Sequence, residues 1–330
     1  MYSVFHPMSS YRKSLTMSAP HPSCQSPGNP MFACSFNWIY TLSDFESERR
    51  NRMSEFSNQY GPWAIVTGAS AGIGRSIATD LASRGINIIA VARRQELLDE
   101  LQVELSEDYS IEVRTIRADL TDPESISKIE LLTSDLEIGL VVPNAGVEMS
   151  GRFIDSSLEA NEHMLRLNVH APMQLAKVFG ARMAERGKGG ILFISSLFGY
   201  QGIPHVANYA ATKAYILSLG EALYAEMKPH GVDVTVLSPG LTDTDMPANM
   251  PINFKRMPIL TQHPDDVART GLNALGRKAT VVSGLLNKFY AWENRFLPRA
   301  FPVALFGFLI RRAYKKDTAI KPVTCSSGTL

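Results

Sequence analysis

From Trp63 onward, short apolar runs alternate with longer amphipathic segments, and few folds accommodate that alternation. Seven mainly apolar runs are expected to form buried strands, the last being the weakest: Trp63–Thr67, Ile86–Val91, Ile111–Ile116, Ile138–Val142, Ile191–Ile194, Val232–Leu237 and Val281–Val282. The segments between them are expected to be helices: Gly74–Ser83, Gln95–Leu105, Pro123–Thr133, Leu158–Glu185, Asn208–Lys228 and Pro264–Leu275. Nearly continuous apolar strands that alternate with helices indicate a parallel sheet covered on both faces. The predicted fold class is therefore α/β, a doubly wound parallel sheet of about seven strands.

This pattern predicts one domain flanked by two extensions. The chain has 330 residues, of which 45% are hydrophobic and 20% charged, so it can bury one large core. No linker divides residues 60–280, and the domain is assigned to residues 56–283. Residues 1–55 are rich in Ser, Pro, Asn and Met without periodicity. They are expected to form a disordered extension, with a targeting role or a start at Met53 as alternatives. Residues 284–330 are expected to add a helical extension and a flexible tail.

Charge and metal-binding residue types exclude several functions. The net charge of +1 gives no reason to expect a nucleic-acid partner. Cys24, Cys34 and Cys325 form no Cys-x-x-Cys pair, which argues against a zinc site or a disulfide framework. The seven histidines show no ligand spacing, so no metal is expected. The sparse cysteines fit a reducing compartment, and a cytoplasmic location is predicted.

A glycine-rich turn follows the first strand. The sequence there is Thr67-Gly68-Ala69-Ser70-Ala71-Gly72-Ile73-Gly74, which then continues into a helix. Glycines allow a tight turn and a close approach of backbone to a pyrophosphate, and a helix N-terminus offers free N–H groups to phosphates. The strand before and the helix after favour dinucleotide binding over a purely structural turn. The spacing is Gly-x-x-x-Gly-x-Gly, which differs from the commoner Gly-x-Gly-x-x-Gly.

Tyr209 and Lys213 are four residues apart in a predicted helix, so their side chains share one face. A nearby ammonium would lower the pKa of the phenol from its ordinary value of about 10. Together with the glycine turn, this pair resembles the short-chain dehydrogenase/reductase family, and the resemblance covers roughly residues 60–282. It implies a single Rossmann-fold catalytic domain and an oxidoreductase that transfers a hydride between a nicotinamide and a carbonyl or alcohol carbon.

Further motifs match the family in its usual order. They are Asp119-Leu120 after the third strand, Asn144-Ala145-Gly146 after the fourth, Asn168 in a helix, Ser196 after the fifth strand, and Pro239-Gly240-Leu241-Thr242 after the sixth. Ser196 lies thirteen residues before Tyr209, which is the family's usual interval. Pro143 stands where the family carries an Asn, and a local change without loss of function is expected. Each residue alone could be structural, but their joint occurrence favours function.

The resemblance implies a role for each catalytic residue. Tyr209 would exchange a proton with the substrate oxygen, and Ser196 would hydrogen-bond that oxygen. Lys213 would lower the pKa of Tyr209 and hold the nicotinamide ribose, while Asn168 would hold a water that links Lys213 to solvent. The residues expected to bind the cofactor are Gly68, Ser70, Ala71, Gly72, Ile73, Gly74, Arg75, Arg93, Arg94, Asp119, Leu120, Asn144, Ala145, Gly146, Tyr209, Lys213, Pro239, Gly240, Leu241 and Thr242.

The end of the second strand favours NADP(H) over NAD(H). An NAD-binding site usually carries an acid about 20 residues past the glycines, where it holds the ribose 2′-hydroxyl. Here the strand runs into Arg93 and Arg94, whose guanidinium groups suit a 2′-phosphate. Arg75 adds a positive charge, and Ser70 could donate a hydroxyl. The alternative is that Arg93 and Arg94 are solvated charges, in which case NAD(H) would serve.

The expected substrate is an apolar carbonyl or alcohol compound, such as a fatty acyl or steroid-like molecule. The segment Asp243–Met250, with Phe254, Met257 and Leu260 beyond it, could form an apolar lid, and Phe198, Tyr200 and Ile203 could add a wall. Equally, these residues could only pack against one another. His205 could line the substrate site or be an incidental loop residue.

The apolar run from Phe296 to Arg312 allows two interpretations. It could pack on the domain or on another subunit, or it could lie on an anionic membrane surface, because Lys315 and Lys316 extend its basic end. The family pairs through the helices of Asn168 and Tyr209, which implies a homodimer or homotetramer.

Two other function classes remain alternatives. One is a dinucleotide-binding sensor or scaffold without catalysis, although no catalytic residue is missing; the other is a sugar-nucleotide epimerase or dehydratase, whose glycine spacing differs.

Overall fold

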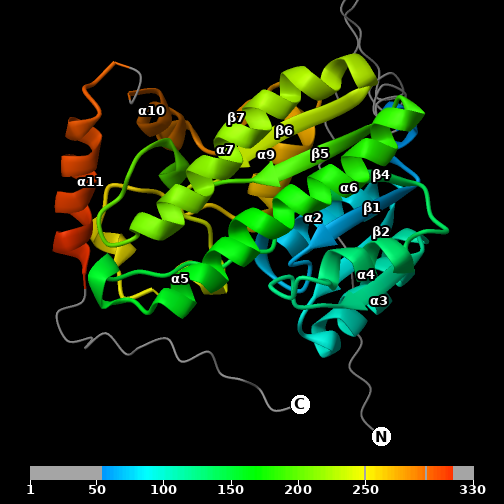
Figure 1. Ribbon diagram of the computed structural model, residues 1–330, viewed down its shortest axis with the longest axis horizontal. Helices are drawn as coiled ribbons and strands as arrows, with labels where there is room; N and C mark the ends of the chain where they lie inside the picture. The colour runs from blue at the N-terminus through cyan, green and yellow to red at the C-terminus, as the bar shows by residue number, and fades with distance from the viewer. Residues whose placement is uncertain (1–53, 249, 294–295, 315–330) are drawn as a thin grey trace, which may run out of the picture.

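A parallel sheet of seven strands forms the centre of the protein (Figure 1). The computed structural model describes residues 54–248, 250–293 and 296–314. The strands lie in the order β3-β2-β1-β4-β5-β6-β7. They are β1 Trp63–Thr67, β2 Asn87–Ala92, β3 Val113–Arg117, β4 Ile138–Val142, β5 Gly189–Ile194, β6 Val232–Ser238 and β7 Thr280–Val282. The predicted fold class and all seven predicted strands are thereby confirmed.

Helices cover both faces of this sheet. They are α2 Gly72–Ser83, α3 Gln95–Tyr109, α4 Ser125–Leu132, α5 Leu158–Leu165, α6 Ala171–Arg186, α7 Ala207–Met227, α8 Asp245–Ala248, α9 Pro264–Ala274, α10 Leu285–Glu293 and α11 Ala300–Ala313. Short helical turns add η1 Phe153–Asp155, η2 Arg166–His170, η3 Leu197–Tyr200, η4 Lys228–His230 and η5 Phe254–Arg256. Figure 1 shows α6 and α7 side by side across one face of the sheet.

The two-residue period of the strands distributes the core between the two faces. In β1, Ala64 and Val66 pack in a cluster with side chains of α2, α3 and α9, whereas Ile65 packs on the opposite face with side chains of α4 and α6. All five residues of β1 are buried, as are those of β4. A strand buried on both faces cannot alternate apolar and polar residues, which explains the continuous apolar runs in the sequence.

A helical segment that the sequence did not predict precedes β1. Residues 54–60 are helical, and they include two positions that had been assigned to the extension. Phe56 and Tyr60 pack against the core, and the Tyr60 hydroxyl donates a hydrogen bond to Asp233 Oδ2 at 2.8 Å. Because this contact joins residues 173 apart in sequence, no local periodicity could indicate it. The remainder of the predicted extension, residues 1–53, lies outside the described residues.

The C-terminal extension folds back onto the domain. Phe306, Ile310 and Ala313 of α11 are buried against Met250 and Met257 from the segment after β6. The Asn253 backbone N–H also donates to the Ala313 carbonyl at 2.8 Å. One face of α11 therefore packs on the domain, as one of the two interpretations of its sequence proposed. The predicted flexible tail, residues 315–330, lies outside the described residues.

Candidate active site

The glycine turn after β1 leaves no room for side chains. Gly68 has φ +67°, and an added Cβ would lie 2.9 Å from Asn144 Nδ2. A Cβ on Gly74 would lie 2.3 Å from the Gly68 carbonyl oxygen, so this glycine serves close packing of helix and turn. At the N-terminus of α2, Ala71 makes no side-chain cap. The first N–H groups of α2 therefore remain available to an anion, as a pyrophosphate site requires.

A cavity of about 920 Å³ opens from this turn along the carboxyl ends of the first four strands. Twelve of the predicted cofactor residues line it: Gly68, Ser70, Ala71, Gly72, Ile73, Arg93, Arg94, Asp119, Leu120, Asn144, Ala145 and Gly146. The cavity continues past Glu148 to Met246, Met250 and Tyr314. It is thus a long groove with a polar, glycine-rich end and an end bordered by methionines.

The other predicted cofactor residues do not line this cavity. Arg75 instead pairs with Glu104 of α3, and Gly74 is packed behind the turn. Beyond β6, the Pro239 carbonyl accepts a hydrogen bond from the Leu197 N–H at 2.8 Å, and the buried Thr242 hydroxyl donates to the Gly240 carbonyl at 3.1 Å. Residues 239–242 precede Thr244, which does line the cavity. That Pro239, Gly240, Leu241 and Thr242 contact a cofactor stays a prediction.

Positive charge gathers where β2 and β3 end. Arg94 Nη2 donates to the Ser70 hydroxyl at 3.4 Å, which links the arginine to the glycine turn. Burial alone would raise the pKa of Asp119, but hydrogen bonds from the backbone and hydroxyl of Thr121, with the charge of Arg93, lower it below its ordinary value. Asp119 is therefore an ionised acceptor at neutral pH. This end of the groove can take both a hydrogen-bond donor and an anionic group.

The loop after β4 is fixed to the first strand. The backbone N–H groups of Asn144 and Ala145 both donate to the Thr67 hydroxyl at 3.0 Å, and Asn144 Nδ2 donates to the Thr67 carbonyl at 2.9 Å. Pro143 follows directly on β4, and these bonds form beside it. The substitution of the family's asparagine by Pro143 thus leaves this anchor in place.

Asn168 lies in a π-helical turn, η2, between α5 and α6. The structure confirms a helical stretch over Leu158–Glu185, and it adds a π turn within that stretch that the sequence did not predict. The turn brings the Asn168 amide against Val147, whose N–H donates to Asn168 Oδ1 at 2.9 Å and whose carbonyl accepts from Asn168 Nδ2 at 2.8 Å. Asn168 Nδ2 also donates to the Thr212 hydroxyl of α7 at 3.2 Å. Such π turns often occur at functional sites, and here the turn joins the β4 loop to α7.

Tyr209 and Lys213 face the same side of α7, as their spacing predicted. Both are buried, and the Lys213 ammonium lies 5.7 Å from the centroid of the Tyr209 ring. Lys213 Nζ donates to the Ile194 carbonyl at 3.0 Å, and the Tyr209 hydroxyl makes a hydrogen bond with Ser196. A Cβ on Gly146 would come within 3.7 Å of Lys213 Nζ. The lysine thus lies directly behind the wall of the groove.

The pKa of the Tyr209 phenol departs from the expectation. Burial raises this pKa above its ordinary value, the hydrogen bond with Ser196 lowers it partly, and the charge of Glu148 raises it further. Burial also lowers the pKa of Lys213 to about 8. The sequence had suggested that Lys213 would dominate and lower the pKa of Tyr209. Desolvation of the phenol outweighs that effect here.

Glu148 is a site residue that the sequence did not indicate. It follows Gly146 by two positions and lines the groove. Burial raises the pKa of its carboxyl group to about 8, with a partial lowering by a hydrogen bond with Ser150. The position just after a strand at the carboxyl edge was the only sequence signal that could have drawn attention to it.

The predicted apolar wall is only partly realised. Met246 and Met250 line the groove, and Met257 and Ile203 are buried in the cluster that α11 completes. Leu260, by contrast, is 68% exposed and faces away from it. The ring of His205 lies 5.5 Å from the ring of Tyr314, at the border of the groove. The segment after β6 therefore contributes both to packing and to the lining of the cavity.

The family model of short chain dehydrogenases matches residues 62–253. The chain belongs to the short-chain dehydrogenase/reductase family. The 7beta-hydroxysteroid dehydrogenase of Clostridium sardiniense is 33% identical to it over 253 residues, which are 76% of this chain and 97% of that protein. The very-long-chain 3-oxoacyl-CoA reductase of Bos taurus is 30% identical over 263 residues, or 78% of this chain and 83% of that reductase.

A solved relative supports the same assignment. The structure of a short-chain dehydrogenase from Sphingobium yanoikuyae in complex with NADPH has a TM-score of 0.65 and 30% identity, covering 71% of this chain and 93% of the other. As a short-chain dehydrogenase/reductase, this protein is an oxidoreductase that acts on CH–OH groups with a nicotinamide dinucleotide typical of the family. Within the part of the chain that the structure describes, no helix combines the length and apolar character needed to cross a bilayer.

Proposed function

We propose that this protein is an NADP-dependent carbonyl reductase or alcohol dehydrogenase for apolar substrates. The observation that carries the proposal is the cluster of the buried Tyr209 and Lys213 with the half-buried Ser196, in which Lys213 lies behind Gly146 at the wall of a groove that suits a dinucleotide. The groove fits such a cofactor, since its glycine turn has no space for a Cβ and its helix N-terminus is uncapped.

In the proposed mechanism, the dinucleotide when bound supplies or accepts the hydride. Tyr209 exchanges the proton with the substrate oxygen, and Ser196, already hydrogen-bonded to the Tyr209 hydroxyl, holds that oxygen while its charge changes. Lys213 Nζ is buried near the phenol and supplies positive charge as the phenolate forms. Asn168 holds the backbone of Val147 and so keeps the β4 loop against α7.

The preference for NADP(H) follows from the charge at the end of β2. Arg93 and Arg94 line the groove, and no carboxylate occupies the turn directly after the strand. Forked guanidinium donors suit a 2′-phosphate, whereas a ribose hydroxyl usually needs an acid. The NADPH complex of the related dehydrogenase agrees with this preference.

The apolar substrate class rests on the far end of the groove. Met246, Met250 and Pro251 line it, and the two methionine side chains are adaptable in shape. The two relatives described above are named for a hydroxysteroid and for a very-long-chain oxoacyl thioester, both largely apolar. The alternative without catalysis, a dinucleotide-binding sensor, is less favoured, because the side chains proposed for catalysis are all present.

The decisive experiment measures NADPH and NADH oxidation with steroid ketones, oxoacyl thioesters and small aldehydes, for the wild type and for Tyr209→Phe. We expect turnover of an apolar ketone with NADPH, and a loss of turnover in the variant with unchanged NADPH binding. Near-normal rates in Tyr209→Phe would contradict the mechanism. Tight NADPH binding without turnover of any of these substrates would favour the sensor.

We further propose a cytoplasmic location, with contact to membranes, and a homodimeric state. The homodimer would form through α6 and α7. On these two helices and at the end of α5, Met173, Tyr215 and Leu165 are between 37% and 40% exposed. These apolar side chains suit contact with a second copy of the same surface, where each helix meets its equivalent. Light scattering combined with size exclusion should report twice the monomer mass, or four times for a homotetramer.

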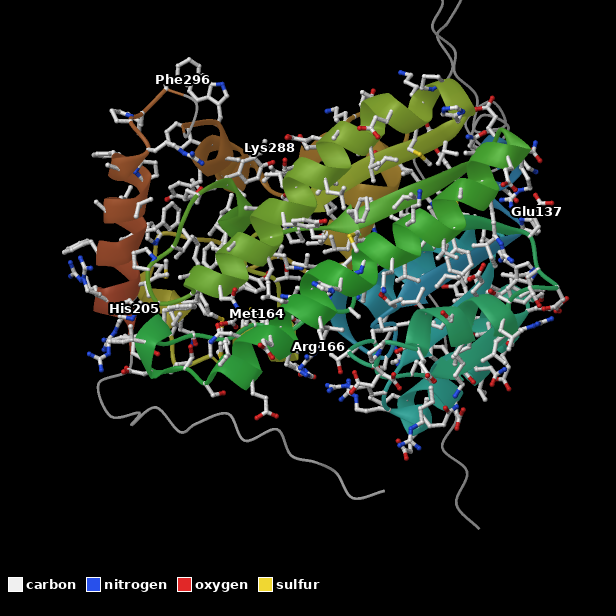
Figure 2. All side chains as sticks on the ribbon, viewed as in Figure 1. Glu137, Met164, Arg166, His205, Lys288 and Phe296 are labelled. Carbon is white, nitrogen blue, oxygen red and sulfur yellow. The ribbon has the colours of Figure 1, made fainter. Side chains whose placement is uncertain are left out.

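A second exposed apolar surface lies on α10 and α11, and we propose that it contacts anionic lipid. Its apolar side chains are Leu285, Leu286, Phe289, Trp292, Phe296, Phe301 and Phe308. Exposed basic residues accompany them: Lys288, Arg299, Arg311 and Arg312. Figure 2 shows Phe296 at the outer edge of the molecule near one end of α11, and Lys288 on α10 further toward the centre of the view. Aromatic residues combined with arginine and lysine suit the interface of a negatively charged membrane.

A further inference from the structure

We propose that Glu148 recognises the substrate by a hydrogen bond to a second, neutral oxygen, so that the preferred substrates are apolar carbonyl compounds that also carry a hydroxyl or another carbonyl group. This inference rests on the proposed function and names the substrate class of the same site. It assigns a residue that the reaction itself does not require.

The first support is the fixed position of Glu148. The preceding residue, Val147, is held through both its N–H and its carbonyl by Asn168, at 2.9 and 2.8 Å. Glu148 lines the groove between the catalytic wall at Gly146 and the methionines. When ionised, its carboxylate raises the pKa of both the Tyr209 phenol and the Tyr314 phenol, so Glu148 lies near both side chains. Glu148 therefore lies within the part of the groove that a substrate held by Tyr209 would occupy.

The second support is an unused hydrogen-bonding atom. Glu148 Oε1 is shielded from solvent and has no hydrogen-bond partner. Buried polar atoms are nearly always hydrogen-bonded, and an exception in a groove indicates a group meant for a ligand. Among the described residues, no charged side chain contributes to the pKa of this carboxyl; only burial and Ser150 do. The carboxyl thus lacks the ion pair that a purely structural buried acid would need.

The chemistry of the carboxyl selects the group it binds. The titratable groups near it are the phenols of Tyr209 on α7 and of Tyr314 after α11, and the Ser150 hydroxyl lies on its own loop. Burial raises its pKa to about 8, so at pH 7 it is mainly a neutral acid with one O–H donor and a free acceptor. A neutral acid suits a hydroxyl or carbonyl oxygen. A substrate carboxylate or phosphate at this point would be repelled once Glu148 ionises.

The test compares three steroid probes: a monoketone, its hydroxylated derivative and its amino derivative. The wild type should favour the hydroxylated ketone by about tenfold in kcat/KM, the ratio that one ordinary hydrogen bond provides. Glu148→Leu should remove that preference through KM. Glu148→Gln should keep part of it, because an amide still donates. The control, Glu107→Leu on the exposed side of α3, should change none of these values.

Two results would overturn the proposal. An equal loss of kcat/KM for all three probes in Glu148→Leu would assign Glu148 a structural role. A wild-type preference for the amino derivative that disappears in Glu148→Leu would show that a charged carboxylate binds cations instead. If the wild type turns over no probe, the proposed function fails, but calorimetric binding of the same probes to the NADPH-loaded protein still decides the role of Glu148. Tighter binding of the hydroxylated probe to the wild type than to Glu148→Leu would support it, and equal binding would refute it.

Discussion

At the scale of single residues, Arg93 and Arg94 are the side chains proposed to favour NADP(H) over NAD(H). Both line the groove, and Arg94 is linked to the glycine turn through Ser70. Replacing both by alanine removes the donors proposed for the 2′-phosphate, and each charged hydrogen bond contributes about 1.5 to 3 kcal/mol. We expect the Kd for NADPH to rise by at least about tenfold and the Kd for NADH to change little. Fluorescence titration with both dinucleotides measures this. An equal weakening of both would show that the arginines support the fold of the groove and not the phosphate.

Burial of Lys213, which its proposed catalytic role requires, has a cost for stability. Burial lowers its pKa from 10.5 to about 8, so the folded protein holds this proton less tightly than the unfolded chain does. Below pH 8 the buried ammonium therefore reduces the free energy of unfolding, and the reduction disappears as the pH rises toward 10.5. Lys213→Met should be inactive but more stable at pH 7, by an amount on the order of 1 to 3 kcal/mol.

Denaturant unfolding of the two proteins at pH 7 and pH 10 measures this effect. Glu148 also titrates near pH 8, but it is present in both proteins, so its contribution cancels in the difference. The stability advantage of Lys213→Met should shrink at the higher pH. A variant that is less stable than the wild type at pH 7 would mean that the hydrogen bond from Lys213 to the Ile194 carbonyl outweighs the burial of the charge.

The residues of the site differ in how far the sequence could reveal them. Tyr209 and Lys213 share a helix face, so a four-residue spacing was enough to predict their placement. Glu148 could not be found in this way. Its importance arises from Asn168, which fixes the adjoining backbone, and from Tyr314, which approaches it across the groove from a distant part of the chain. Likewise, the raised pKa of Tyr209 depends on how deeply α7 is buried. The four-residue spacing of Tyr209 and Lys213 gives no information about that burial.

At the scale of elements, α11 shows what a sequence pattern could and could not decide. Its apolar run was compatible with packing and with a membrane surface, and the structure buries some of its residues and exposes others. Phe306 is 1% exposed, and its ring lies 6.4 Å from that of Phe198 and 5.9 Å from that of Tyr290. Phe308, two residues on, is 53% exposed. The strands and most helices were predictable because their period follows from local geometry, whereas the π turn at Asn168 and the docking of α11 depend on distant contacts.

This division within α11 can be tested with a matched pair of variants. Phe306→Ala should lower the free energy of unfolding by about 3 to 5 kcal/mol, because it opens a cavity in a packed cluster. It should also raise KM for an apolar ketone more than the Kd for NADPH, since the cluster adjoins Met250 at the substrate end. Phe308→Ala should leave the thermal midpoint nearly unchanged. Equal effects of the two variants in thermal unfolding would contradict the packing of α11 described here.

At the scale of the whole molecule, the exposed faces of α10 and α11 should bring the protein to lipid. Trp292 and Phe296 lie with ring centroids 4.5 Å apart and are 57% and 67% exposed, so together they offer a compact apolar contact. The nearby basic residues should each add about 1 kcal/mol of attraction to an anionic surface. Co-sedimentation should therefore show binding to vesicles that contain phosphatidylserine, weaker binding to phosphatidylcholine alone, and a decrease of binding with added salt.

The double variant Trp292→Ser, Phe296→Ser should bind these vesicles less. The control Phe153→Ser, which changes an exposed phenylalanine in η1, should bind as the wild type does. If the double variant binds vesicles normally but loses a dimer seen by light scattering, this surface contacts a second copy of the chain and not a membrane.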